Sequence, residues 1–391
     1  MGERISLMIV AGEASGDAHA AALVRALKES EPHVDFQFFG ATGQKMRAGG
    51  VVSIVDSDSL SILGLAEIGR ALPRFWQAYS ALKRAAESAR RCVVLVDCDL
   101  SELHVPSPRG LRVIYYISPQ LWAWRGYRVR NIRRDVDLLL TILPFEKGWY
   151  DRRGVSHVEF VGHPLAGTVQ ARTIREEFCQ RHELDETRPV ISLLPGSRHK
   201  ELERILPVML EATGLLSHKR SDLQFIIAIA PGRAPEEALA HVRRARLRGL
   251  ALPDTIRVVQ GETREVLAAS RAAAITSGTA TLEAALLGIP HVIVYKESLL
   301  NWHILGRLID TEHYGLTNLI AGERVATELI QNDLNGERLA EELEMLLEDE
   351  RNRATRLRLK EAVSNLGEGG ASKRAAEAIL RAVREWRSDR S

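Results

Sequence analysis

Short apolar runs that alternate with longer amphipathic stretches constrain the fold of this chain more than any other feature. Runs such as Ile5–Val10, Cys92–Val96 and Ala272–Thr276 are continuously apolar. Continuous runs of this length are typical of parallel strands that helices cover on both faces. The pattern therefore predicts an α/β fold built from strand–helix units.

The predicted strands form two sets, separated by a polar segment at 170–188. The first set comprises Ile5–Val10, Val34–Phe39, Cys92–Val96, Val113–Tyr116, Leu138–Ile142 and Val158–Val161. The second set comprises Val190–Leu194, Phe225–Ala230, Ile256–Val259, Ala272–Thr276 and His291–Tyr295. Because 391 residues exceed what one hydrophobic core usually serves, we predict two Rossmann-like domains, 1–168 and 169–367, that face each other across a cleft. Ligands of such domains bind at the carboxyl ends of the strands.

The balance of charged residues argues against a nucleic-acid partner. The 53 lysines and arginines nearly offset the 51 aspartates and glutamates, and the formal net charge is +2. Such a chain has no global field that attracts a polyanion. Three cysteines are too few and too scattered for a disulfide framework or a zinc site. We therefore expect a protein of the reducing cytosol.

Any membrane contact is expected to be peripheral. The N-terminus lacks the basic region and cleavage site of a signal peptide, and no apolar stretch reaches the roughly 18–20 residues of a spanning helix. In segment 59–91, apolar residues at helical spacing are interleaved with arginines and lysines. This segment either contacts anionic lipid or packs on the sheet, and we expect Pro73 to begin a new helix within it.

The turn after the first predicted strand contains Glu13, Ser15 and Asp17. Small residues allow a sharp turn there, and Ser15 is a suitable helix N-cap. The two carboxylates disfavour a dinucleotide site, because a pyrophosphate would be repelled. They suit hydrogen bonds to sugar hydroxyls, and the alternative is that they only complement the helix dipole.

Asp97 and Asp99 follow the strand Cys92–Val96. A carboxylate at the carboxyl end of a parallel strand lies where a general base is needed. The D-x-D spacing also matches a divalent-metal clamp on a diphosphate. We expect no metal here, because the diphosphate is predicted to bind in the other half.

Two turns in the second half predict that diphosphate site. The first contains Gly196, Ser197 and Arg198 and precedes a helix, so that N–H groups and a guanidinium can bind an anion. The second runs from Ser277 through Gly278 and Thr279 to Glu283. Glu283 lies one helical turn beyond Thr279, where it can hold a ribose, although an ordinary capped helix has the same pattern.

Two further residue types have open interpretations. Trp122 and Trp124 follow the strand Val113–Tyr116 and either stack on a sugar or acyl chain or pack in the core. His163 is interpreted as a structural or hinge residue rather than a catalytic one.

In order and spacing, a series of motifs resembles the lipid-A-disaccharide synthase family. The motifs are Ala11–Asp17, Tyr116–Pro119 with Trp122–Arg125, Pro144–Glu146 with Tyr150, Val161–Pro164, Leu194–Arg198, Ser277–Glu283, Asn318–Gly322 and Glu328–Gln331. The resemblance covers about residues 5 to 380. It implies an inverting glycosyltransferase of the GT-B fold on the inner face of the bacterial inner membrane, whose C-terminal helix, about 368–391, packs back on the first domain.

The resemblance also implies substrates and residue roles. UDP-2,3-diacylglucosamine and 2,3-diacylglucosamine 1-phosphate would give a β-1,6-linked disaccharide 1-phosphate and UDP. Asp97 matches the family's essential aspartate, Arg198 its arginine and Glu283 its ribose-binding acid. Matching motifs place Ser118, Trp122, Asn318 and Gln331 among the substrate-binding residues. Arg198 and helix N–H groups would stabilise the leaving UDP, so we expect neither a metal nor another cofactor.

This sequence departs from the family pattern after Asp97. The family usually has Asp-x-Pro-Asp-Phe-Asn there, whereas this chain has Asp97-Cys98-Asp99-Leu100-Ser101-Glu102, and Thr317 and Thr327 replace two usual prolines. Either Asp97 or Asp99 is therefore the candidate base. The alternatives are a transferase for another lipid-linked acceptor, a UDP-N-acetylglucosamine epimerase, and an inactive UDP-sugar-binding protein. The oligomeric state stays open, with a homodimer as one form to test.

Overall fold

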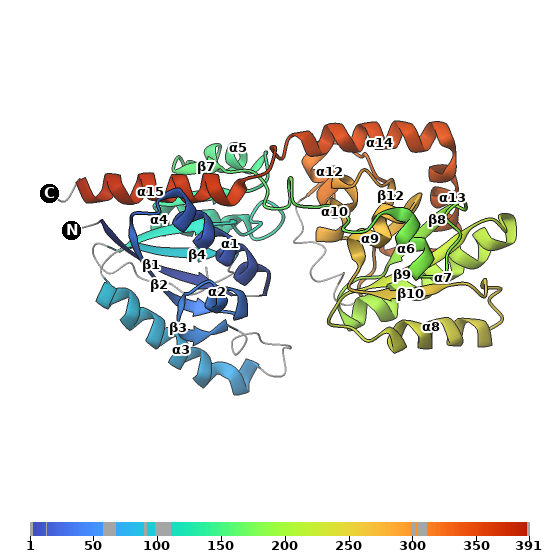
Figure 1. Ribbon diagram of the computed structural model, residues 1–391, viewed down its shortest axis with the longest axis horizontal. Helices are drawn as coiled ribbons and strands as arrows, with labels where there is room; N and C mark the ends of the chain where they lie inside the picture. Colours follow the sequence, from blue (N-terminus) through green and yellow to red (C-terminus); the bar gives the residue numbers. More distant parts are fainter. Residues whose placement is uncertain are drawn as a thin grey trace. The chain divides into compact units, whose positions relative to one another are not determined.

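The computed structural model describes residues 3–12, 14–57, 68–89, 92–97, 111–298, 302 and 311–388. Contacts along the chain divide it into two compact units. Unit 1 comprises Met1–Pro164 and Gly369–Ser391, and unit 2 comprises Leu165–Glu368. Each unit is built on its own sheet (Figure 1).

The sheet of unit 1 has seven strands in the order β3-β2-β1-β4-β5-β6-β7, all paired in parallel. They are β1 (Arg4–Ala11), β2 (Asp35–Thr42), β3 (Val52–Asp56), β4 (Cys92–Val96), β5 (Arg112–Tyr116), β6 (Leu138–Thr141) and β7 (Val158–Phe160). The chain runs outward from β1 to β3, then returns to place β4 on the other side of β1. The strand order thus reverses between β1 and β4, and in such sheets ligands bind at this switch point.

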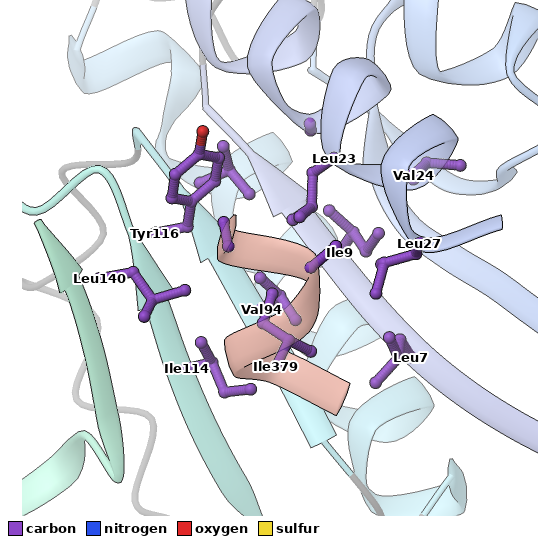
Figure 2. Packing of buried hydrophobic residues seen from close by; sticks show 14 of the residues in the cluster. Leu7, Ile9, Leu23, Val24, Leu27, Val94, Ile114, Tyr116, Leu140 and Ile379 are labelled. Atoms are coloured by element: carbon purple, nitrogen blue, oxygen red, sulfur yellow. The ribbon is translucent and has the colours of Figure 1, made fainter. Parts of the chain in front are cut away.

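Helices cover both faces of this sheet because neighbouring residues of each strand point to opposite sides. Leu7 and Ile9 of β1 pack against α1 (Ala14–Ser30) and α15 (Ala371–Ser388), and Ile379 of α15 lies among them (Figure 2). Met8 and Val10 face α3 (Ile68–Ala89) instead. On that same face lie α4 (Val129–Asp135) and α5 (Glu146–Asp151), and the short α2 (Gln44–Ala48) follows β2.

The sheet of unit 2 repeats the design with six strands in the order β10-β9-β8-β11-β12-β13. They are β8 (Val190–Leu194), β9 (Gln224–Ile229), β10 (Arg257–Gln260), β11 (Ala272–Thr276), β12 (His291–Tyr295) and β13 (Glu328–Ile330). The helices of its described residues are α6 (Arg175–Arg181), α7 (His199–Lys219), α8 (Pro235–Leu247), α9 (Thr263–Ala269), α10 (Thr279–Leu286), α12 (Leu316–Ala321), α13 (Gly336–Leu347) and α14 (Asp349–Ser364). Here the strand order reverses between β8 and β11.

The two parallel sheets confirm the predicted α/β class with two Rossmann-like halves. One local expectation is wrong: Pro73 does not begin a helix but lies inside α3, which starts five residues earlier at Ile68. As the sixth residue of α3, Pro73 lies beyond the first four N–H groups, so it removes one hydrogen bond within the helix. Among the described helices, none combines the length and apolar composition needed to span a bilayer.

Candidate functional site

The switch point of unit 1 brings the start of α1 to Asp97. Strands β1 and β4 pair with Ala11 opposite Val96, so the residues that follow each strand are neighbours. The Ser15 hydroxyl donates a hydrogen bond of 2.9 Å to Asp97 Oδ2. Asp97 itself has φ 45°, a conformation rare for a residue with a side chain. A Cβ on Gly16 would lie 2.9 Å from the Val96 carbonyl oxygen, so only glycine lets α1 start this close to β4.

His19 of α1 interacts with this carboxylate, and His163 in turn interacts with His19. Burial lowers the pKa of His19; Asp97 opposes this shift and Lys45 adds to it. Burial, with a smaller effect of His19, lowers the pKa of His163 to about 4. Both imidazoles are therefore neutral at pH 7, and neither neutralises Asp97. No motif in the sequence marks His19 as a site residue. The one available signal is its position four residues after Ser15, which places both on the same face of a helix.

The Asp17 carboxylate is bound by the turn that follows β2. The carboxylate accepts hydrogen bonds from the backbone N–H groups of Gly43, Lys45 and Met46, at 2.8 to 3.1 Å. The residue is only 4% exposed. The carboxylate therefore holds the start of α2, and these hydrogen bonds give no support to the predicted sugar contact. Glu13 and Asp99 lie outside the described residues.

Ser118 and Trp122 belong to a buried cluster around Glu146. The Trp122 indole N–H donates to Glu146 Oε1 at 3.0 Å, and the Ser118 hydroxyl lies 3.5 Å from the same oxygen. Leu143 N–H donates to Oε2 at 2.9 Å. Burial raises the pKa of Glu146 to about 7, against the opposing effect of these hydrogen bonds. The cluster fixes the loop that follows β5, so Ser118 and Trp122 are positioned by packing.

In unit 2, the side chain of Glu201, from the first turn of α7, fills the turn after β8. Glu201 Oε2 accepts hydrogen bonds from the N–H groups of Ser197 and Arg198, at 2.9 and 3.0 Å. Gly196 has φ 109°, and a Cβ there would lie 2.4 Å from the same oxygen. The N–H groups expected to bind a phosphate are thus occupied by Glu201. The Arg198 side chain, in contrast, is 83% exposed.

The turn after β11 has open backbone donors. Strands β8 and β11 pair with Leu194 opposite Ile275, so this turn adjoins the first. Gly278 has φ 151°, and a Cβ there would meet nothing within 4 Å. The N–H groups of Gly278, Thr279 and Ala280 donate to no acceptor in the described part of the chain. The Ser277 hydroxyl donates to the Tyr314 carbonyl oxygen at 2.7 Å.

Glu283 lies one turn into α10 and is held by a cation that the sequence did not suggest. Arg264 Nε donates to Glu283 Oε1 at 2.9 Å, and the Glu283 side chain is 16% exposed. Because the second carboxylate oxygen has no hydrogen bond to the described residues, it can accept one from a ligand hydroxyl.

Asn318 and Gln331 both form hydrogen bonds with other parts of the chain. Asn318 Oδ1 accepts from the N–H groups of Val325 and Ala326, and its amide donates to Ala326 O and Glu328 Oε1, all at 2.8 to 2.9 Å. Gln331 exchanges two hydrogen bonds with the backbone of Glu297. We assign Asn318 a positioning role, since no polar atom of its side chain remains for a substrate.

An apolar pocket lies beneath α3 in unit 1. Its empty volume is about 860 Å³, solvent at the mouth included. Residues of β1, β4, β5, α3 and α4 line it, among them Val10, Leu82, Ala86, Val93, Leu95 and Val113. Leu95 lines the pocket from β4 and precedes Asp97 by two residues, whereas Leu111 and Val136 line it just before the starts of β5 and β6.

Comparisons with known proteins agree over nearly the whole chain. The sequence model of the lipid-A-disaccharide synthetase family matches residues 7–383. The lipid-A-disaccharide synthase of Trichlorobacter lovleyi is 40% identical over 384 residues, 97% of this chain and 98% of that protein. The synthase of Myxococcus xanthus is 40% identical over 379 residues, 96% of each chain.

Solved structures show the same fold at low identity. One solved structure is named a putative UDP-N-acetylglucosamine 2-epimerase from Listeria monocytogenes. It matches with a TM-score of 0.63 and 16% identity, over 98% of this chain and 97% of that chain. A glycosyltransferase from Rickettsia africae matches with a TM-score of 0.61 and 12% identity, over 98% of each chain. At such identity these matches support the fold alone, while the family match decides between the two activities. The chain belongs to the lipid-A-disaccharide synthase family of glycosyltransferases.

Proposed function

We propose that this chain transfers 2,3-diacylglucosamine from UDP-2,3-diacylglucosamine to the 6-hydroxyl of 2,3-diacylglucosamine 1-phosphate, with inversion at the anomeric carbon. The observation that carries the proposal is that the switch points of the two sheets carry different chemical groups. Unit 1 has a carboxylate held by a hydroxyl, and unit 2 has open N–H donors beside an exposed guanidinium. A proton acceptor and an anion site are the two functions that this transfer requires.

Unit 2 binds the donor in this proposal. The N–H groups of Gly278, Thr279 and Ala280 begin an α-helix, where the helix dipole favours a phosphate. Arg198, from the adjacent turn, adds a full positive charge to the leaving diphosphate. Glu283 accepts a hydrogen bond from the ribose through the oxygen that Arg264 leaves open. These groups stabilise the charge that develops on UDP, so no metal is required.

Asp97 is the proposed base. Its carboxylate takes the proton of the acceptor 6-hydroxyl while that oxygen attacks the anomeric carbon and the bond to UDP breaks. The proton ends on Asp97 and the electron pair of the broken bond on the UDP phosphate. Ser15 holds Oδ2, which leaves Oδ1 for the acceptor. One displacement inverts the configuration.

The apolar pocket is proposed to hold an acyl chain of the acceptor. Its lining is mostly apolar and includes Leu95, two residues before Asp97, so an acyl chain in it would leave the sugar near the base. Trp76 of α3 is 63% exposed and contacts Tyr79 edge-on. An exposed tryptophan suits the headgroup region of a bilayer, and we propose α3 as the peripheral contact with the inner membrane surface.

The test is an assay of UDP release and product mass with both acylated substrates in the presence of EDTA. Wild type and Asp99→Ala are expected to form the disaccharide 1-phosphate, and Asp97→Ala is not. Loss of product in Asp99→Ala with retention in Asp97→Ala would move the base to Asp99. If wild type binds UDP but forms no product with this acceptor, the proposed reaction is wrong.

A further inference from the structure

A pocket rich in arginine lies at the amino ends of the central strands of the unit 2 sheet. The proposed donor site lies at the carboxyl ends of the same strands. Arg188 and Arg271 stand just before β8 and β11, at the amino ends of strands whose carboxyl ends carry the two turns described above. Arg175 of α6, Arg220 after α7 and Arg356 of α14 complete what we term the arginine pocket. Its empty volume is about 940 Å³, including solvent at its mouth.

The lining of the arginine pocket is strongly positive. Five arginines face two aspartates, an excess of three positive charges. Arg220 pairs with Asp222, with N–O distances of 2.8 and 2.6 Å, and Arg271 pairs with Asp349. The other three arginines have no carboxylate oxygen within 4 Å among the described residues.

Those three guanidinium groups are instead held by neutral oxygens. Arg175 donates to the carbonyl oxygens of Ala269, Glu186 and Arg188. Arg188 donates to the carbonyls of Asp222 and Ser221. Arg356 donates to Asn352 Oδ1 and the Gly288 carbonyl, each at 2.8 Å. Carbonyl oxygens orient a guanidinium but do not neutralise it, so these side chains keep full positive charges in fixed orientations.

Unused donors accompany the excess charge. Arg188 Nη1 and Arg356 Nη2 make no hydrogen bond to any described residue. Burial, and secondarily the like charge of Arg271, lowers the pKa of Arg356. An anion in the pocket would accept hydrogen bonds from these N–H groups. Its negative charge would also offset the repulsion between Arg356 and Arg271.

We propose that the arginine pocket is a second binding site of this protein and that it binds a phosphate group. Guanidinium groups bind phosphate oxygens through paired hydrogen bonds, and the excess charge matches a multiply charged anion. A bound phosphate would connect α6, the strand starts and α14. The phosphate is that of a free anion such as pyrophosphate or that of an anionic lipid headgroup.

The test titrates pyrophosphate into the full chain by calorimetry, at an ionic strength held constant with sodium chloride. The titrations use the Arg198→Ala background, in which the proposed donor site lacks its guanidinium. Arg188→Gln is expected to weaken binding about tenfold, as the loss of a charge-assisted hydrogen bond does. Asp349→Asn adds one net positive charge at an exposed position and is expected to tighten binding about threefold.

A second arm distinguishes the sources of the phosphate. Cosedimentation with phosphatidylglycerol vesicles, compared with phosphatidylcholine vesicles, is expected to depend on Arg188 if the ligand is a lipid headgroup. Pyrophosphate binding without vesicle binding assigns a free anion. The proposal is overturned if neither ligand binds at millimolar concentration, or if Arg188→Gln and Asp349→Asn both bind with the parent's affinity. Because Asp349→Asn should gain affinity, misfolding of Arg188→Gln cannot by itself produce the expected result.

Discussion

The hydroxyl of Ser15 and the carboxylate of Asp97 are joined by a hydrogen bond of 2.9 Å across 82 residues of sequence. The contact exists because β1 and β4 are neighbours and because Gly16 permits α1 to start against the end of β4. It fixes one oxygen of the proposed base.

Asp97→Asn is expected to lower kcat by about 10² to 10⁴, the usual contribution of a positioned general base. Ser15→Ala should lower it about tenfold, because a hydrogen bond to a charged group contributes roughly 1.5 kcal/mol or more. The double variant should be no slower than Asp97→Asn alone, since Ser15 acts through the carboxylate. Steady-state kinetics of the three variants measures this. Additive losses would contradict the assigned relationship.

Gly278→Ala is expected to weaken UDP binding about tenfold. An alanine at φ 151° is strained by about 1–3 kcal/mol, and relief of the strain moves the N–H groups of the open turn. Gly288→Ala is the matched control, because Gly288 ends the same helix at φ 68° with equal space around it. Both variants should lose stability, whereas only Gly278→Ala should lose UDP affinity in calorimetry. Equal affinities would show that the turn does not bind the diphosphate.

Glu283→Gln is expected to remove discrimination between ribose and deoxyribose. The wild type should bind UDP about tenfold more tightly than 2′-deoxy-UDP, because the carboxylate accepts a hydrogen bond from the hydroxyl. In the variant, UDP affinity should fall to about that of the deoxy analogue. Competition binding with both nucleotides checks this. A variant that still prefers UDP by the same factor would exclude Glu283 as the ribose ligand.

Ala86→Leu is expected to raise the KM for an acylated acceptor several-fold. Ala86 is buried and lines the apolar pocket, so three added carbons occupy volume that the acyl chain would use. The KM for UDP-2,3-diacylglucosamine and the melting temperature serve as controls for overall damage. An unchanged KM in a folded variant would place the acyl chain elsewhere.

Much of the fold could be predicted from sequence because buried parallel strands have a strong local pattern. The predicted runs 92–96, 190–194, 272–276 and 291–295 coincide with β4, β8, β11 and β12. The edge strands β3 and β13 were not predicted. Most residues of β3 are exposed, and β13 has three residues, so neither has the continuous apolar run that marks a central strand.

The candidate site was predictable only where its residues follow a strand. Asp97 and the two glycine turns have such a signal, whereas their partners do not. Asp17 bonds to backbone groups 26 to 29 residues away, and Arg264 reaches Glu283 from another helix. Glu201 is the exception, since an acid three residues after a helix N-cap commonly bonds back to the turn. That pattern could have indicated that Glu201 occupies the N–H groups of the turn after β8.

Glu146 gives a test of stability against pH. Its pKa is raised from 4.5 to about 7 by burial in the cluster with Ser118 and Trp122. Between these values the folded protein keeps a proton that the unfolded chain has released. The carboxyl group therefore favours folding less as pH rises from 4.5 to 7, by up to roughly 3 kcal/mol, and its contribution is constant above that window.

Glu146→Gln removes this titration while keeping the size of the side chain. The free energy of unfolding of wild type, relative to the variant, should decrease as pH rises from 5 to 7 and level off by pH 8. Urea unfolding of both proteins at each pH measures the difference, and the buried histidines, common to both, cancel. A difference that stays constant over this range would show that Glu146 titrates as an ordinary carboxyl group. Its hydrogen bonds to the loop, rather than its proton, would then hold Ser118 and Trp122 in place.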